Sequence, residues 1–169
     1  GLLLGRRMAG KGGALSLLPL SLRAGQTVAV IGPFSDCQGV TPDGDTDAPL
    51  SCTYIHTHAG DMDYVSTVLS AAREEAQAAA ATVTYAQGSN ILTPFNGSAG
   101  IAAAVAAAQA ADVVLLSVGL STLVEMEGND RSTLRWPAAQ QALLDAVAAV
   151  AGPKTVLLLF SATMTDLNF

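Results

Sequence analysis

The sequence has 169 residues, of which 50% are hydrophobic and 13% are charged, so it suits one globular domain and excludes a disordered chain. The net charge of −6, with no basic stripe, makes nucleic acid and anionic membranes poor partners. The longest apolar tract, residues 99–120, is broken by polar residues and glycine, which argues against a membrane-spanning helix.

The amino-terminal residues are the first feature along the chain. Residues 1–22 contain apolar patches, but they lack the order of basic region, apolar run and small-residue cleavage site that defines a secretory signal. The sequence also begins with Gly1 and not with Met. We therefore expect the chain to be a fragment of a longer protein.

Four apolar runs predict buried parallel strands. Each is short, rich in β-branched residues and apolar on both faces, which is typical of strands covered on both sides in an open α/β sheet. They are residues 27–32, 82–86, 112–119 and 155–162.

Three helical segments alternate with these strands, at residues 64–81, 98–111 and 137–150. The third has Pro in its first turn, and it carries an apolar stripe. The residues of the stripe are Ala138, Leu143, Leu144, Val147 and Val150. The order β-α-β-α-β-α-β predicts an α/β fold with an open, mostly parallel, doubly wound sheet.

Residues 33–63 form a long stretch, rich in Gly, Pro, Asp, Thr and Ser, that does not fit this alternation. It contains Cys37 and Cys52, which either remain separate or form a disulfide worth about 3 kcal/mol. The sequon at Asn96 would permit N-glycosylation if the chain is secreted, and secretion would also favour the disulfide.

The same stretch holds His56 and His58, followed by Asp61 and Asp63. A His-x-His pair can bind a metal when it lies on a strand, but no further ligand completes the set, so we favour a polar loop and expect no metal. The sequence also lacks both glycine-rich phosphate-binding motifs, and we expect no nucleotide and no other cofactor.

An acidic segment follows the third predicted strand. It places Glu125, Glu127 and Asp130 directly before Arg131. Ligands of open α/β sheets bind beyond the carboxyl ends of the strands, so either glutamate could serve as a general acid, with Arg131 orienting a carboxylate. The alternative is a solvated acidic loop in which Asp130 and Arg131 pair locally.

A family resemblance bears on this choice. The strings TVAVIGPFSD, ADVVLLSVGLSTLVEMEGNDRSTLRWPAAQQALLDAVA and TVLLLFSA follow one another as in the second domain of glycoside hydrolase family 3. The E-x-E-G-x-D-R string at residues 125–131 most resembles the β-xylosidase and β-glucosidase branch. The resemblance covers most of the chain and is weakest at residues 1–14 and 33–88.

The resemblance implies a three-layer α/β/α sandwich from a retaining exo-glycosidase that acts on xylo- or gluco-oligosaccharides. A separate (β/α)8 domain would carry the Asp nucleophile, and this chain would supply the acid/base. Glu125 matches that residue best and Glu127 is the alternative, while Asp130 and Arg131 would bind or orient the substrate. Residues 1–24 would be a linker, and residues 25–169 would be the domain, truncated at its carboxyl end. The protein would be extracellular.

The sequence departs from the family pattern at three places, one of which is the long stretch of residues 33–63. Ser121 and Thr122 replace an acidic residue and an amide, and residues 161–166 lack the two glycines of an SGGP turn. A non-catalytic carbohydrate-binding or scaffold domain derived from the family is therefore the second hypothesis. In either case we expect the isolated chain to be inactive, because it has no candidate nucleophile.

Overall fold

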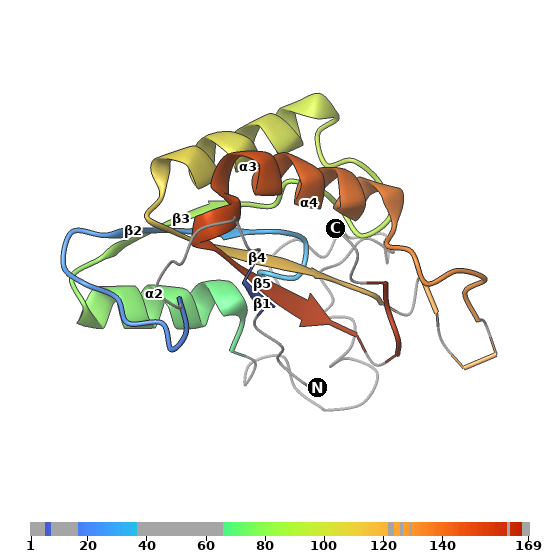
Figure 1. Cartoon of the computed structure of the whole chain (residues 1–169), viewed down its shortest axis with the longest axis horizontal. Helices are drawn as coiled ribbons and strands as arrows, with labels where there is room; N and C mark the ends of the chain where they lie inside the picture. The colour runs from blue at the N-terminus through green and yellow to red at the C-terminus, as the bar shows by residue number, and fades with distance from the viewer. Residues whose placement is uncertain are drawn as a thin grey trace, which may run out of the picture.

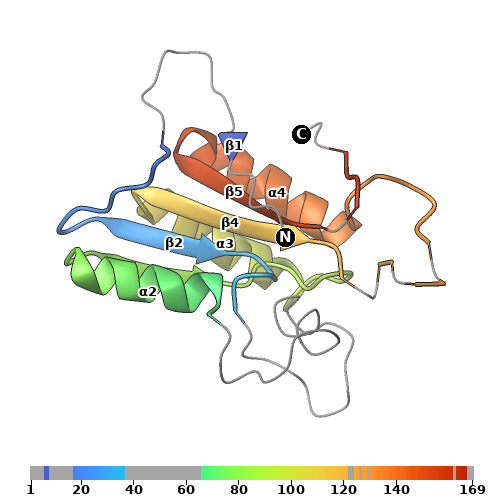
Figure 2. The ribbon, with the colours of Figure 1, turned by 90° about the horizontal axis from the view of Figure 1, so that it is seen from below.

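The computed structural model describes residues 6–7, 17–36, 66–121, 124–125, 127–128, 130–161 and 163–166. These residues form one five-stranded sheet, flanked by helices on both faces (Figure 1, Figure 2). The strands, in spatial order, are β1 (Arg6–Arg7), β5 (Thr155–Phe160), β4 (Val113–Gly119), β2 (Thr27–Ile31) and β3 (Thr82–Ala86).

The four longer strands run parallel, and β1 alone of the described strands pairs antiparallel, with β5. The predicted open, mostly parallel α/β sheet is confirmed. The two-residue strand β1 was not predicted, because two arginines carry no strand periodicity.

The helices lie where the sequence predicts them, with shifted ends. They are α2 (Val68–Ala78), α3 (Ser98–Ala110) and α4 (Ala138–Ala151), and a 3-10 turn, η2 (Gly152–Lys154), joins α4 to β5. The predicted start of α2 at residue 64 is wrong. Thr67 has an extended backbone and caps the helix: its hydroxyl accepts the Ser70 N–H, and its own N–H donates to the Ser70 hydroxyl.

The larger part of the core lies between the sheet and helices α3 and α4. It includes Leu116 and Leu157 from the strands and Leu143, Leu144 and Val147 from α4, all nearly inaccessible to solvent. Each such side chain contributes about 1.5–3 kcal/mol by leaving water. A smaller cluster packs β2 against α2 on the other face.

Two details of the predicted burial are wrong. The strand β3 forms an edge of the described sheet, and all five of its residues are half-buried or exposed where we expected burial on both faces. In α4, Ala138 and Val150 face solvent, whereas Ala139, Gln140 and Ala151 are buried with the predicted leucines and Val147. The buried stripe is therefore rotated from the predicted one.

Candidate active site

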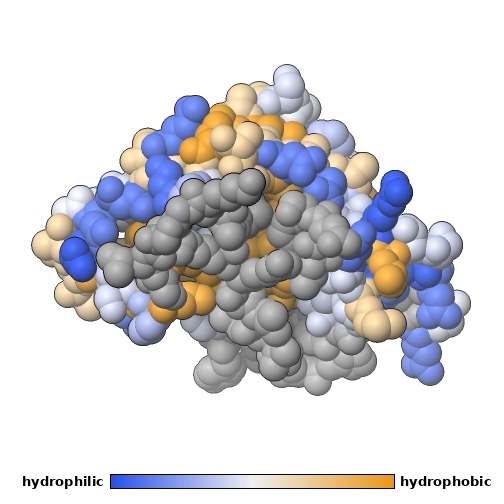
Figure 3. Space-filling model, viewed as in Figure 1, coloured by the Kyte–Doolittle hydropathy of each residue, from blue (hydrophilic) through white to orange (hydrophobic). Residues whose placement is uncertain are grey.

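The candidate site lies where the parallel strands end. The post-β4 loop, defined here as residues 120–137, leaves the sheet at Gly119 and returns at the start of α4. It projects beyond the end of the sheet, and its far end is mainly hydrophilic (Figure 1, Figure 3). The post-β5 segment, residues 161–166, leaves the same edge, so the two can meet.

Backbone hydrogen bonds fix the first part of the post-β4 loop. The Leu120 N–H donates to the carbonyl of Phe160, 2.8 Å away, at the end of β5. The carbonyl of Ser121 then accepts the N–H groups of Val124 and Glu125 at 2.9 and 3.1 Å. Leu120 and Ser121 are buried, so the backbone of Glu125 is anchored to the sheet within a few residues.

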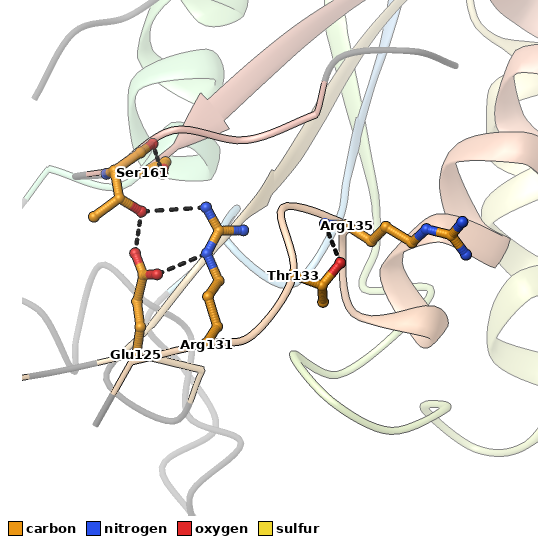
Figure 4. A network of polar contacts seen from close by, with 6 residues as sticks. Glu125, Arg131, Thr133, Arg135 and Ser161 are labelled. Atoms are coloured by element: carbon orange, nitrogen blue, oxygen red, sulfur yellow. Dashed lines mark hydrogen bonds and ion pairs between the residues drawn. The ribbon is translucent and has the colours of Figure 1, made fainter.

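Three side chains, those of Glu125, Arg131 and Thr163, meet beyond this turn. Figure 4 labels the first two. The Arg131 Nε donates to Glu125 Oε2 at 2.7 Å in a charge-assisted hydrogen bond, and its Nη2 donates to Thr163 Oγ1 at 3.4 Å. The Thr163 hydroxyl in turn donates to Glu125 Oε1. The exposed fractions of the Arg131 and Glu125 side chains are 9% and 18%, so this pair is largely shielded from solvent.

A second set of contacts ties the same two segments together. The indole N–H of Trp136 donates to the carbonyl of Asp166 at 2.8 Å, and the Asp166 N–H donates to the Leu134 carbonyl at 2.9 Å. Nearby, the Arg135 N–H donates to the Thr133 hydroxyl at 3.2 Å. Figure 4 draws this contact as a dashed line. The outgoing and returning parts of the post-β4 loop are thus both joined to the post-β5 segment.

The structure separates the four candidate residues into two groups. Glu125 and Arg131 lie together, whereas Glu127 and Asp130 are exposed. Within the described ranges, Arg131 forms its ion pair with Glu125 and not with Asp130, so the local pair of the alternative interpretation is not formed. Glu125 is therefore a fixed carboxylate, while Glu127 faces solvent.

Sequence reasoning missed two residues of this region. Thr163 stands at one of the positions where the resemblance expects glycine, and it supplies a hydroxyl to Glu125. Gln140 is completely buried and bonded to the end of β4. Its signal was available: it lies at helical spacing from Leu143, Leu144 and Val147, and a polar residue in a buried stripe needs polar partners.

The other candidate residues lie away from this network. Asn96 is exposed just before α3, with a positive φ of 51°. The cysteines and histidines, Cys37, Cys52, His56 and His58, are outside the described residues. The described ranges contain no group of three or more His, Cys, Asp or Glu side chains able to hold a metal ion, and no helix in them is long and apolar enough to cross a membrane.

Known proteins resemble this chain in sequence over most of its length. One relative is the probable exo-1,4-beta-xylosidase bxlB of Aspergillus fumigatus, 34% identical over 142 residues, covering 82% of this chain and 15% of the relative. Another is the exo-1,4-beta-xylosidase xlnD of Aspergillus niger, 29% identical over 148 residues, 85% of this chain and 16% of the relative. The chain thus spans about 15% of the length of these relatives.

Solved structures agree. The GH3 beta-glucosidase of Bifidobacterium adolescentis matches with a TM-score of 0.63 and 30% identity, over 98% of this chain and 20% of that one. The GH3 exo-beta-xylosidase XlnD shares the fold, with a TM-score of 0.58 and 22% identity, over 94% of this chain and 20% of that one. The family model "Glycosyl hydrolase family 3 C-terminal domain" matches residues 14–169. The chain therefore belongs to glycosyl hydrolase family 3, as its C-terminal domain.

Proposed function

We propose that this domain supplies the acid/base carboxyl group to the active site of a retaining, exo-acting O-glycosidase. The supporting observation is the ion pair of Glu125 with Arg131, held on a loop at the carboxyl edge of the sheet. The substrate class is a β-linked xylo- or gluco-oligosaccharide, as the names of the relatives and of the structural neighbour suggest.

The mechanism needs a second carboxyl group. In retaining glycosidases the two carboxyl groups lie about 5–5.5 Å apart: one attacks the anomeric carbon, and the other protonates the leaving oxygen and then activates water. We place Glu125 in the second role, with Glu127 as the alternative. The Asp nucleophile comes from a (β/α)8 domain that packs against this edge, and no cofactor takes part.

The position of Glu125 supports its choice over Glu127. General acid catalysis depends on a proton donor that is held in place, and contacts often tighten or exchange only when substrate is bound. Glu125 is held by its backbone and by Arg131, and Thr163 is a hydroxyl partner that can be exchanged for a leaving oxygen. Asp130 is exposed beside Arg131, and we propose that it contacts substrate.

A non-catalytic carbohydrate-binding or scaffold domain is the second candidate function. It is favoured by one observation: both carboxylate oxygens of Glu125 already accept hydrogen bonds within the domain. Under this hypothesis the carboxylate of Glu125 holds the loop in place and transfers no proton. In that case the two loops would present a surface for sugar hydroxyls without contributing to bond cleavage.

We place the start of the domain within residues 1–24 and not after them, because the family match begins at residue 14 and β1 (Arg6–Arg7) pairs with β5. An extracellular location, suited to polysaccharide substrates such as xylan, is consistent with the exposed sequon at Asn96. In that setting Cys37 and Cys52 would form a disulfide, which peptide mapping with and without reductant would reveal.

The test of this function uses Glu125→Gln and Glu127→Gln in the complete parent enzyme. With an aryl xyloside whose leaving group needs no protonation, the acid/base variant loses the second step, and azide restores its rate by attacking the glycosyl intermediate. We expect rescue for Glu125→Gln only. Rescue of Glu127→Gln alone would move the role to that residue, and normal rates in both variants would favour the scaffold.

A further inference from the structure

Among the residues that the structure describes, the end of β4 has no strand neighbour on the side of β2. The strand β2 pairs with β4 only as far as Ile31 and Leu116. It turns away at Gly32, where φ is +114° and a Cβ would lie 1.9 Å from the Ser117 carbonyl oxygen, so only glycine fits. Pro33 then has no N–H with which to continue the ladder. The last residues of β4 extend beyond this point.

The side chain of Gln140 occupies the place that β2 leaves. Leu120 directs its N–H to β5, so Gly119, one residue earlier, directs its backbone groups to the opposite side, toward β2. There the Gln140 Oε1 accepts the Gly119 N–H at 2.8 Å, and the Gln140 Nε2 donates to the Gly119 carbonyl at 2.8 Å. The amide thus bonds Gly119 as a neighbouring strand would.

The same amide also reaches a third segment. The Gln140 Nε2 donates to the carbonyl of Ile91 at 3.0 Å, in the connection between β3 and α3. Gln140 and Ile91 are both completely buried. An apolar residue at position 140 would leave three buried backbone groups without these partners: the Gly119 N–H, the Gly119 carbonyl and the Ile91 carbonyl. Each lost hydrogen bond would cost about 1–3 kcal/mol of stability. The glutamine therefore satisfies backbone groups as well as filling space.

The location of Gln140 in the chain explains its consequence for the site. Gly119 is the residue from which the post-β4 loop leaves, and Gln140 lies in the first turn of α4, where the loop returns. The contact between them therefore closes the loop at its base. Leu120 and Ser121, which follow Gly119, are buried and hydrogen-bonded, so the path of the chain is fixed from Gly119 to the turn that ends at Glu125.

We propose that Gln140 is the positioning residue of the post-β4 loop: it replaces the missing strand neighbour and sets the direction in which the loop carries Glu125. The proposal deepens the proposed function and rests on it for the catalytic use of the loop. The structural part of the proposal, that Gln140 fixes the loop, can be tested in the 169-residue chain, because the measurement needs no enzyme activity.

The experiment compares Gln140→Met, which keeps the volume and removes all three hydrogen bonds, with Gln141→Met as the matched control. Gln141 is the adjacent residue, and its Nε2 donates to Asp145 Oδ1 on the surface at 2.9 Å. Amide hydrogen exchange is followed by NMR. For Gln140→Met we expect Gly119, Val124 and Glu125 to exchange roughly tenfold faster or more, with the centre of β4 unchanged. The control should match the unsubstituted chain.

Two exchange results would overturn the proposal. One is unchanged exchange at Gly119, Val124 and Glu125. The other is equal acceleration along all of β4, which would show a loss of general stability and not of loop position. If Gln140→Met does not fold, Gln140→Glu is used: it keeps an acceptor for Gly119 but turns an oxygen toward the carbonyls of Gly119 and Ile91, and should loosen the same amides.

The catalytic part is tested with the same variants in the complete parent enzyme. A misplaced acid/base lowers kcat and leaves substrate binding intact, so we expect kcat to fall by about tenfold or more with little change in KM. An unchanged kcat with a loosened loop would overturn the role. If the unsubstituted enzyme has no glycosidase activity, the proposed function fails, while the exchange data still decide whether Gln140 fixes the loop.

Discussion

At the scale of single residues, the most important contact of the candidate site is the one between Arg131 and Glu125. The Arg131 guanidinium bonds Glu125 six positions earlier and Thr163 from the neighbouring segment, although Asp130 is adjacent in sequence. The position of the acidic residues directly after the third predicted strand predicted their presence at the sheet edge. It did not predict which carboxylate Arg131 would bind, because that depends on how residues 161–166 lie beside the post-β4 loop.

Replacement of Arg131 by Met tests the importance of this contact. Glu125 would remain largely shielded without its cationic partner, so we expect the free energy of unfolding to fall by about 1 kcal/mol, with greater mobility of the loop. Arg135→Met is the control, because Arg135 is exposed. Urea unfolding of both variants measures the difference, and equal stability of the two would contradict the expectation.

Tyr85 offers a prediction about pH. Burial, with a smaller contribution from Asp36, raises the pKa of Tyr85 to about 12 from its ordinary value of 10.0. Between about pH 10 and pH 12, the folded chain therefore keeps the phenolic proton of Tyr85 that the unfolded chain has lost. Stability from Tyr85 is fully present below pH 10 and is lost as the pH rises toward 12.

We therefore expect the urea midpoint of the unsubstituted chain to fall more steeply between about pH 10 and pH 12 than that of Tyr85→Phe. The variant has no phenol at this position, while the other titrating groups are shared and cancel in the comparison. An ultraviolet difference titration provides a second measurement. Parallel pH profiles for the two proteins would show that Tyr85 ionises normally in the fold.

At the scale of secondary-structure elements, the start of α2 shows how local hydrogen bonds decide a boundary. The Ala-rich sequence suits a helix from residue 64, and periodicity gives no reason to begin later. The helix starts at Val68 because the Thr67 and Ser70 hydroxyls exchange hydrogen bonds with the first free N–H groups. The signal was present as a Thr with Ser three residues later, which is a weaker form of the usual Ser/Thr-x-x-Glu box.

The variant Thr67→Ala should lower the free energy of unfolding by about 1 kcal/mol, because it removes the acceptor for the Ser70 N–H. Ser66→Ala, one residue earlier and exposed, is the matched control and should change stability by less than about 0.5 kcal/mol. Chemical denaturation gives both values, provided that the slope with denaturant is unchanged. A loss of stability in the control as large as in Thr67→Ala would assign the effect to something other than the cap.

At the scale of the whole molecule, the proposed function makes this domain one side of a site shared with a second domain. The described residues bring Glu125, Arg131 and Thr163 to the carboxyl edge of the sheet. Retaining chemistry requires a second carboxyl group at about 5–5.5 Å, on the opposite side of the sugar. We place that group in the (β/α)8 domain of the proposed parent enzyme.

We therefore expect the purified 169-residue chain to fold but to show no turnover of aryl xylosides or aryl glucosides above the spontaneous rate. The reason is the absence of the nucleophile, whose loss removes the covalent step. Circular dichroism and a chromogenic assay on the same sample make the test, with the complete parent enzyme as the positive control. Turnover by the chain alone that disappears in Glu125→Gln would disprove the division of the site between two domains.

The sequence by itself determined the parallel α/β sheet, the alternation of strands and helices, and the family. The sheet and the alternation follow from local patterns: β-branched runs such as that of β4, and the helical spacing of Leu143, Leu144 and Val147. The family follows from a resemblance, carried most specifically by the E-x-E-G-x-D-R string at residues 125–131. Only the tertiary structure decided that Arg131 binds Glu125, that Thr163 joins them, and that Gln140 completes β4 at Gly119. Hydrophobic periodicity reports which face of an element is buried, but polar pairing depends on where separate strands end beside one another, and that is fixed only when the sheet forms.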